Sequence, residues 1–173
     1  MSEKALERLN QASREIAEAR FLDCCGSREW ARAMTAARPF VDVTALIEKA
    51  ERIWRSLEAR DWLEAFAAHP KIGSRGSAPK QRAQSARWSR GEQSGAHAAA
   101  DSVLEALAEA NRLYEEKFGY IFIVCATGKS AAEMLEICRR RLNNNAATEL
   151  EIAAEEQRKI TEIRLGKLLE SGI

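Results

Sequence analysis

Apolar residues recur every three to four positions over most of this chain, a spacing that is typical of amphipathic helices. Glycine and proline, the residues that most often interrupt helices, number only 9 and 3 among 173 residues. The breaks in the pattern separate seven helical segments. These expected helices cover residues 14–24, 28–37, 45–58, 61–69, 96–118, 131–142 and 147–170. We therefore expect an all-α domain, a bundle of about seven to eight helices.

Short polar side chains precede several of these segments, where an N-cap oxygen can accept a hydrogen bond from a free N–H group. The expected N-caps of the first three helices are Ser13, Ser27 and either Asp42 or Thr44. Two pairs have the spacing of a capping box: Asp61 with Glu64, and Ser130 with Glu133. Gly119 follows the 96–118 segment as its expected C-cap.

One segment breaks the helical pattern. Tyr120-Ile-Phe-Ile-Val-Cys125 is β-branched and aromatic, directly follows Gly119, and is too short for a core helix. A single extended segment cannot form a sheet, so we expect a buried extended linker at about 120–126. Its backbone N–H and C=O groups need partners, either from helix ends or from a ligand.

Composition narrows the class of protein. The 27 Lys and Arg residues nearly balance 26 Asp and Glu, so the formal net charge of +1 argues against a dedicated nucleic-acid binder. The longest apolar run, residues 120–126, is far below the roughly 20 residues that span a membrane. The first residues do not resemble a secretion signal. We expect one soluble, intracellular domain covering residues 1–173.

The cysteines and histidines give no support for a metal site. None of the four cysteines forms a C-x-x-C pair, and only His69 and His97 could join them as ligands. Free buried thiols in a reducing compartment are the expected state of these cysteines.

A basic stretch between Gly73 and Gly91 reads as a long irregular loop, because no acidic residue lies between Ala65 and Gly91. It is either a solvated loop or a charged flap beside an anionic ligand. Trp88 within it could stack on a base. An alternative function is therefore a helical interaction module that uses the basic 71–90 loop to bind nucleic acid or an acidic partner.

Three side chains are candidates for acid–base chemistry on a small anion. His69 ends an apolar helical segment before Pro70, and histidine titrates near neutrality. Glu92, with Gln93 beside it, is expected near the N-terminus of the 96–118 helix, where a carboxylate is favoured. Arg164 emerges from an apolar stripe and suits a carboxylate. The alternatives are a structural histidine, an ordinary first-turn acid and a snorkelling arginine, whereas His97 is expected to face solvent.

These residues lie in motifs that resemble the 2-oxo-4-hydroxy-4-carboxy-5-ureidoimidazoline (OHCU) decarboxylase family, which completes the conversion of urate to (S)-allantoin. The resemblance covers nearly the whole chain, and the order and spacing of its parts make it specific. Its parts are Arg38-Pro-Phe40, His69-Pro-Lys-Ile-Gly73, Ser89-Arg-Gly-Glu-Gln93, Asn111, Tyr114, Lys117–Ala126, Arg141-Leu-Asn143, Glu149, Glu155, Ile160 and Arg164-Leu165.

The resemblance implies a cofactor-free, metal-free, all-helical decarboxylase that forms homodimers. It makes His69 and Glu92 catalytic, with Pro70 in the pocket wall and Arg164 near the substrate. The residues implied to line the rest of the substrate site are Ser89, Arg90, Gly91, Glu92 and Gln93. The residues implied to offer backbone groups to the ligand are Phe122, Ile123, Val124, Cys125 and Ala126. A second enzymatic alternative is the same fold acting on a different imidazoline or ureide acid.

The C-terminal residues Ser171-Gly172-Ile173 lack a peroxisomal tripeptide, which agrees with a cytoplasmic, bacterial setting. Neither nucleic acid nor membrane is an expected partner.

Overall fold

The structure, a computed structural model, describes residues 3–73, 82–97 and 99–171. Across these ranges the chain forms ten helices and no strand, which confirms the all-α prediction. The helices are α1 Glu3–Gln11, α2 Arg14–Cys24, α3 Arg28–Ala36, α4 Val43–Ser56, α5 Ala59–Ala67, α6 Ala83–Glu92, α7 Ser94–His97, α8 Asp101–Phe118, α9 Ala131–Arg141 and α10 Ala146–Ser171. None of the helices in the described ranges is both long and apolar enough to cross a bilayer.

The chain divides into two compact units. The first unit comprises Met1–Ala65 and Arg158–Ile173, and the second comprises Phe66–Gln157. Helix α10 therefore contributes its first part to the second unit and its last part to the first.

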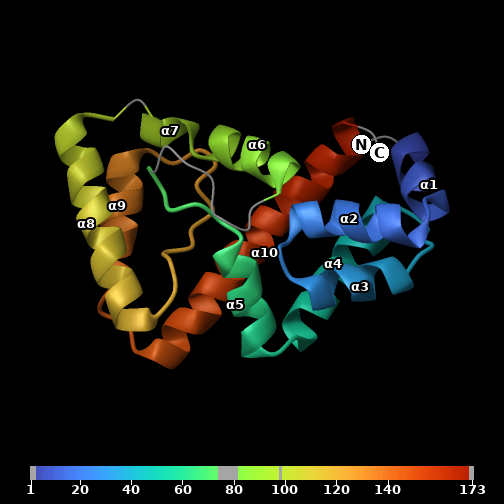
Figure 1. Cartoon of the computed structure of the whole chain (residues 1–173), viewed down its shortest axis with the longest axis horizontal. Helices are drawn as coiled ribbons and strands as arrows, with labels where there is room; N and C mark the ends of the chain where they lie inside the picture. The colour runs from blue at the N-terminus through green and yellow to red at the C-terminus, as the bar shows by residue number, and fades with distance from the viewer. Residues whose placement is uncertain (1–2, 74–81, 98, 172–173) are drawn as a thin grey trace. The chain divides into compact units, whose positions relative to one another are not determined.

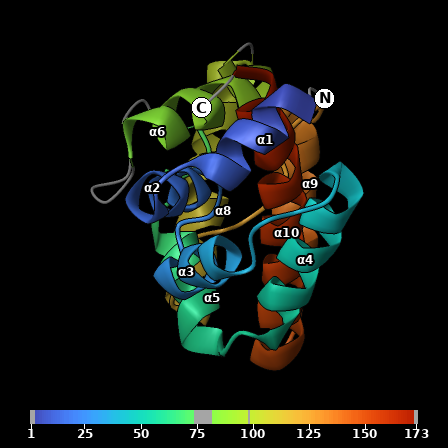
Figure 2. The ribbon, with the colours of Figure 1, turned by 90° about the vertical axis from the view of Figure 1, so that its right-hand side faces the viewer.

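The first unit is built around large aromatic side chains. Phe21 makes edge-to-face contacts with Trp30 and Phe40, at centroid separations of 5.9 and 6.3 Å. Helix α4 lies along the last part of α10 (Figure 2), where Ala50 and Trp54 share a small hollow with Leu165.

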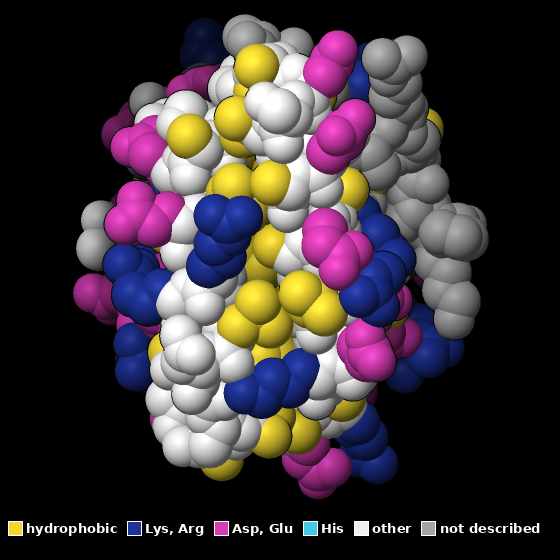
Figure 3. All heavy atoms as spheres, turned by 90° about the vertical axis from the view of Figure 1, so that its left-hand side faces the viewer, with side chains coloured by type: hydrophobic (Ala, Val, Ile, Leu, Met, Phe, Trp, Pro, Cys, Tyr) yellow, Lys and Arg dark blue, Asp and Glu magenta, His cyan; other side chains and the backbone are white. Residues whose placement is uncertain are grey.

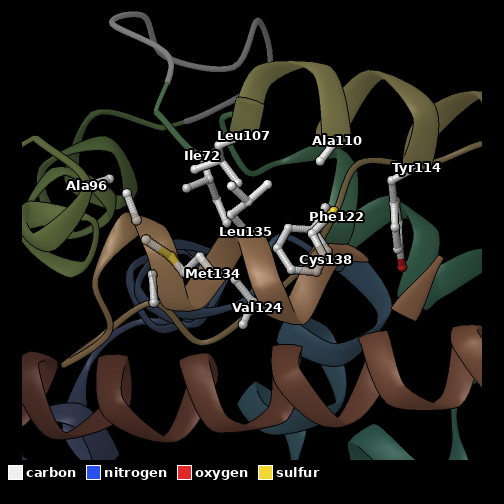
Figure 4. Close-up of a cluster of buried hydrophobic side chains, with 12 residues drawn as sticks. Ile72, Ala96, Leu107, Ala110, Tyr114, Phe122, Val124, Met134, Leu135 and Cys138 are labelled. Carbon is white, nitrogen blue, oxygen red and sulfur yellow. The ribbon is translucent and has the colours of Figure 1, made fainter. Parts of the chain in front are cut away.

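The second unit has its core between α8 and α9, which pack side by side (Figure 1). Side chains from both helices and from residues 122–126 gather in one apolar cluster (Figure 4). Residues 121–126 form neither helix nor strand, and Phe122 and Val124 are buried within this cluster. The expected buried linker is therefore present.

The outer side of α8 and α9 carries a band of hydrophobic side chains bordered by acidic and basic ones (Figure 3). Partly buried apolar residues of these helices include Val103, Leu104 and Ile137, and Leu113 is exposed. This face is less polar than a fully solvated helical surface usually is.

Most of the predicted caps are confirmed. Ser13, Ser27 and Asp42 each accept a hydrogen bond from the backbone N–H three residues later, at 2.7–3.3 Å. Ser130 and Glu133 form the complete capping box. Gly119 adopts a φ of 82°, the left-handed C-cap conformation that glycine favours.

The capping box at Asp61 and Glu64 is wrong. Asp61 is already inside α5, and its carboxylate accepts from the N–H of Glu58 at 3.2 Å. Glu64 instead pairs with Arg28 at 2.5 Å, so a long-range ion pair takes the side chain that the local pattern had assigned to the cap.

The prediction of an irregular loop over 73–91 is wrong for its second half. Residues 83–92 form α6, with Ala86, Ser89 and Glu92 on its buried face at helical spacing. Trp88 is also buried, and this burial removes it as an exposed stacking platform for a base. The rest of that loop, residues 74–81, lies outside the described residues.

The helix expected at 96–118 is two helices, and α1 was not predicted. Helix α7 ends at His97, and α8 begins at Asp101. Gly95 explains part of this arrangement, because a Cβ atom there would collide with the carbonyl oxygen of Lys129. The close approach of α7 to the turn before α9 therefore requires glycine.

A buried ion pair ties the extended segment to the helices of the second unit. The Arg141 guanidinium is 2.6 Å from Glu149 and donates to the carbonyl oxygen of Ile123 at 2.7 Å. Tyr114 donates its hydroxyl proton to the same carboxylate, and burial raises the pKa of this phenol, with the contact to Glu149 adding to the rise. The guanidinium also lies 4.8 Å from the centroid of the Phe122 ring.

Removing the guanidinium should destabilise the chain strongly. Arg141→Met leaves the Glu149 carboxylate buried without its cation, so we expect the free energy of unfolding to fall by about 3 kcal/mol or more. Arg139→Met, on the exposed side of the same helix, is the matched control and should change it by less than about 0.5 kcal/mol. Urea denaturation measures both, and equal effects would contradict a structural role for the pair.

The two glycines near the end of α6 should respond oppositely to alanine. Gly95→Ala forces α7 away from Lys129, so we expect a loss of about 1–3 kcal/mol. Gly91 is helical with open space around its Cα, so Gly91→Ala should raise stability by about 0.5–1 kcal/mol. Thermal unfolding of the two variants tests the packing of α7, and a stabilising Gly95→Ala would refute it.

Candidate functional site

His69 lies just after α5, where its backbone N–H donates to the carbonyl oxygen of Phe66 at 3.1 Å. His69 is half-buried, and the Nε2 atom of its ring is 2.7 Å from Oε1 of Gln157. Gln157 belongs to α10 and is fully buried. The histidine is therefore held by a buried amide from a distant part of the chain.

The residues after His69 are fixed by two further amide side chains. Oε1 of Gln93 accepts a hydrogen bond from the N–H of Gly73 at 3.2 Å. Nδ2 of Asn111 donates to the carbonyl oxygen of Ile72 at 3.3 Å. Segment 69–73 is thus attached to α10 at its start and to residue 93 and α8 at its end.

Glu92 is buried, with 8% of its surface exposed, at the last position of α6. The expectation that it sits near the N-terminus of the following long helix is wrong, because α6 ends there and α8 starts nine residues later. The dipole of α6 opposes a carboxylate at its C-terminal end. Glu92 is therefore buried at a position where the dipole of its own helix does not favour its charge.

Side chains form hydrogen bonds with several backbone groups of the extended segment. Cys125 donates its N–H to Oε2 of Glu156 at 2.7 Å, and its carbonyl oxygen accepts from Nζ of Lys129 at 2.7 Å. Arg141 donates to Ile123, as described above. Within the described residues, the backbone N–H and C=O of Val124 make no hydrogen bond, although Val124 is only 5% exposed.

The charge of Glu92 acts on the thiol of Cys125, a residue of the extended segment. Burial raises the pKa of the Cys125 thiol above its usual range, and the nearby Lys129 ammonium opposes this rise. The carboxylates of Glu156 and Glu92 add to the rise. Glu92 therefore lies within electrostatic reach of Cys125 in the second unit.

The other predicted site residues differ in exposure. Ser89 is buried on α6, Pro70 is half-buried, and Arg90 and Gly91 are exposed. The backbone residues Phe122, Ile123, Val124, Cys125 and Ala126 are all buried.

Arg164 belongs to the first unit, on the last part of α10. It is 2% exposed, which excludes the alternative of a snorkelling surface arginine. Burial raises the pKa of the neighbouring Cys25 to about 11, and the Arg164 charge works against that rise.

The four cysteines are free and buried, as expected. No group of three or more His, Cys, Asp or Glu side chains with the geometry of a metal site occurs in the described ranges.

Sequence reasoning missed Gln157, Glu156 and Lys129. Gln157 lies seven residues before Arg164, so both fall in one row of α10 whose other members are largely apolar. A polar residue in such a row was the signal for Arg164, and the same signal was available for Gln157. Glu156 and Lys129 act on backbone groups, and no sequence pattern marks that role.

Comparison with known proteins assigns the chain to a family. The model of the OHCU decarboxylase family matches residues 10–166. The chain is 46% identical over 155 residues to the uric acid degradation bifunctional protein TTL of Arabidopsis thaliana, covering 89% of this chain and 48% of that protein. It is 32% identical over 145 residues to the 2-oxo-4-hydroxy-4-carboxy-5-ureidoimidazoline decarboxylase of Amia calva, covering 81% of this chain and 79% of that one.

A solved structure agrees with this match. The crystal structure of an OHCU decarboxylase in the presence of (S)-allantoin has a TM-score of 0.76 and 42% sequence identity, covering 92% of this chain and 99% of the other. The chain spans about half the length of the Arabidopsis protein. Because the family model covers most of both units, the chain belongs to the OHCU decarboxylase family.

Proposed function

We propose that this chain is a carboxy-lyase that converts OHCU to (S)-allantoin in urate degradation. The observation that carries the proposal is the pairing of His69 with a buried amide in the unit that also holds Glu92 and the extended segment. Family membership and the likeness to an OHCU decarboxylase crystallised in the presence of (S)-allantoin support the same reaction.

The extended segment has one edge whose backbone groups, the N–H and C=O of Val124, make no hydrogen bond among the described residues. We propose that the ring of the substrate binds along this open edge. In an extended chain, successive residues direct their N–H and C=O groups to opposite edges. Side chains occupy the edge formed by Ile123 and Cys125, whereas Val124 presents the other edge. A cyclic amide and a ureido group offer the donors and acceptors that these buried backbone groups require.

The reaction needs no cofactor, because the ring imine of the substrate accepts the electron pair. The bond between C4 and the carboxylate breaks, CO2 leaves, and a double bond forms between C4 and C5. The imine nitrogen then takes a proton from solvent. In the proposed mechanism, His69 takes the proton of the 4-hydroxyl and delivers it to C5, leaving a carbonyl at C4. Delivery from one face sets the (S) configuration.

Glu92 and the residues around it position the ring in this proposal. An ionised carboxylate only accepts hydrogen bonds, so Glu92 suits the N–H groups of the ring and the ureido group. The rest of the proposed substrate site is lined by Ser89, Arg90, Gly91 and Gln93, and Pro70 lies next to His69 in the chain. Arg164 offers a forked set of donors for the substrate carboxylate.

The proposal extends to the setting of the enzyme. We propose that residues 1–173 act as one domain in the cytoplasm and that two copies form a homodimer. The apolar band on the side of α8 and α9 is a candidate surface for contact between copies, and analytical ultracentrifugation measures the assembly. The nucleic-acid module is the weaker alternative, since α6 occupies part of its loop and Trp88 is buried.

Circular dichroism tests the function directly. Uncatalysed decarboxylation passes through a planar intermediate that is protonated equally on both faces, so its product is racemic and has no dichroism. Purified chain added to freshly generated OHCU should accelerate the reaction and produce the signal of (S)-allantoin. Turnover of a different ureide acid with no turnover of OHCU would identify a same-fold enzyme of other specificity.

Replacing the proposed acid–base group should abolish most turnover. His69→Asn retains an amide that can hydrogen-bond but cannot carry a proton between positions, so we expect a loss of roughly 10²–10⁴ in kcat. The same change at the other histidine, His97→Asn, is the control and should keep wild-type activity. Full activity of a folded His69→Asn protein would exclude the assigned role.

Replacing the buried arginine should weaken binding more than turnover. Arg164→Lys keeps the charge but loses the fork of donors, so we expect KM to rise about 10-fold or more while kcat changes less. Arg158→Lys on the same helix is the matched control, because Arg158 pairs with Glu162 at 3.0 Å. Calorimetric titration with (S)-allantoin provides a second measurement. Equal affinity of Arg164→Ala and wild type would remove Arg164 from the site.

A further inference from the structure

The contact between His69 and Gln157 indicates which ring nitrogen carries the proton as well as where the ring lies. Nε2 and Oε1 are 2.7 Å apart, a short distance for a hydrogen bond from nitrogen to oxygen. Gln157 is fully buried on the helix that also supplies Glu156 to the N–H of Cys125. Neighbouring side chains of α10 thus hold both the histidine and the extended segment.

The chemistry of the amide group fixes where the ring carries its proton. An amide oxygen only accepts hydrogen bonds, so Nε2 of His69 must donate to Oε1 of Gln157. Neutral imidazole carries a single N–H, which leaves the lone pair on Nδ1. The same logic applies to catalytic histidines whose second nitrogen is held by a partner that selects the tautomer.

We propose that Gln157 is a positioning residue that holds the His69 ring and keeps the proton of the neutral ring on Nε2. Nδ1 is then the nitrogen that exchanges protons with the substrate. The second statement rests on the proposed function, whereas the first concerns the chain alone and has its own test. The variants below leave the nearby charged groups in place: Lys71, two residues after His69, with its partner Glu115, and Glu92, Glu156 and Lys129 around Cys125.

Nitrogen NMR of histidine-labelled protein tests the tautomer without any variant of Gln157. The chain has only two histidines, so its imidazole spectrum contains two rings, and His69→Asn identifies which signals belong to His69. We expect the neutral His69 ring to carry its proton on Nε2, with this proton slow to exchange with water. A neutral ring protonated on Nδ1 would overturn the proposal.

Gln157→Glu tests the contact itself through the titration of the ring. A carboxylate in place of the amide favours the imidazolium, so the midpoint of the His69 titration should move to higher pH by about one unit or more. Ala147→Glu is the matched control, since it adds one negative charge at an exposed position of the same helix, about 15 Å away along the axis. The control should leave the midpoint unchanged, because screening is strong at that distance. Equal midpoints in Gln157→Glu and wild type would overturn the proposal.

Steady-state kinetics separates positioning from a merely structural role. Gln157→Met fills a similar volume without an acceptor, so we expect kcat to fall roughly 10- to 100-fold with KM within about 3-fold of wild type. Gln157→Glu should recover part of kcat, because its carboxylate again accepts from Nε2. A Gln157→Met protein with wild-type kcat would overturn the positioning role. If wild-type protein does not decarboxylate OHCU, the proposed function fails, and the two NMR measurements still decide the contact.

Discussion

A single extended segment among helices has no neighbouring strand, so side chains must satisfy its buried backbone groups. Arg141 on α9, Lys129 before α9 and Glu156 on α10 do this, through the carbonyl of Ile123 and both backbone groups of Cys125. Each of these side chains is charged, and a hydrogen bond to a charged group is stronger than one between neutral groups. The second unit depends on this arrangement, because Phe122, Val124 and Ala126 of the segment belong to its apolar cluster.

The same arrangement supports the proposal that the segment holds a ligand. Three charged side chains fix one edge of the segment in place, and that leaves the opposite edge at Val124 rigid and buried. A rigid edge with unpaired N–H and C=O groups loses little entropy when it binds a flat, hydrogen-bonding ring. His69 is held by Gln157, the residue next to Glu156 on α10, so the histidine and the segment share one support.

Local patterns predicted most of the fold. The caps at Ser13, Ser27, Asp42, Ser130 and Gly119 are confirmed because each depends on neighbours within a few residues. The failures involve tertiary contacts. Glu64 forms an ion pair with Arg28 instead of the expected capping box. Gly95 packs closely against the backbone of Lys129, and α7 is a separate helix from α8. Residues 73–91 were expected to form an irregular loop because they are basic and contain no acidic residue, yet residues 83–92 form α6, with Trp88 and Ser89 on its buried side.

The candidate site was predictable in part. His69, Glu92 and Arg164 stood out as polar residues in apolar surroundings or recognisable motifs; in the structure Glu92 and Arg164 are buried and His69 is half-buried. Gln157 was missed although it lies in the same largely apolar row of α10 as Arg164. Glu156 did not stand out, because it contacts backbone rather than a side chain. Such roles follow from the distance between elements that are far apart in the sequence, which spacing along the chain does not encode.

In the proposed site, His69 and the unpaired backbone edge at Val124 bind the same ligand. Titration of nitrogen-labelled protein with (S)-allantoin tests it most directly, because backbone amide and imidazole signals are observed together. We expect the signals of the Val124 amide and the His69 ring to shift together with one dissociation constant, and (R)-allantoin to shift them less. Saturable binding that leaves the signals of both the Val124 amide and the His69 ring unchanged would exclude this site.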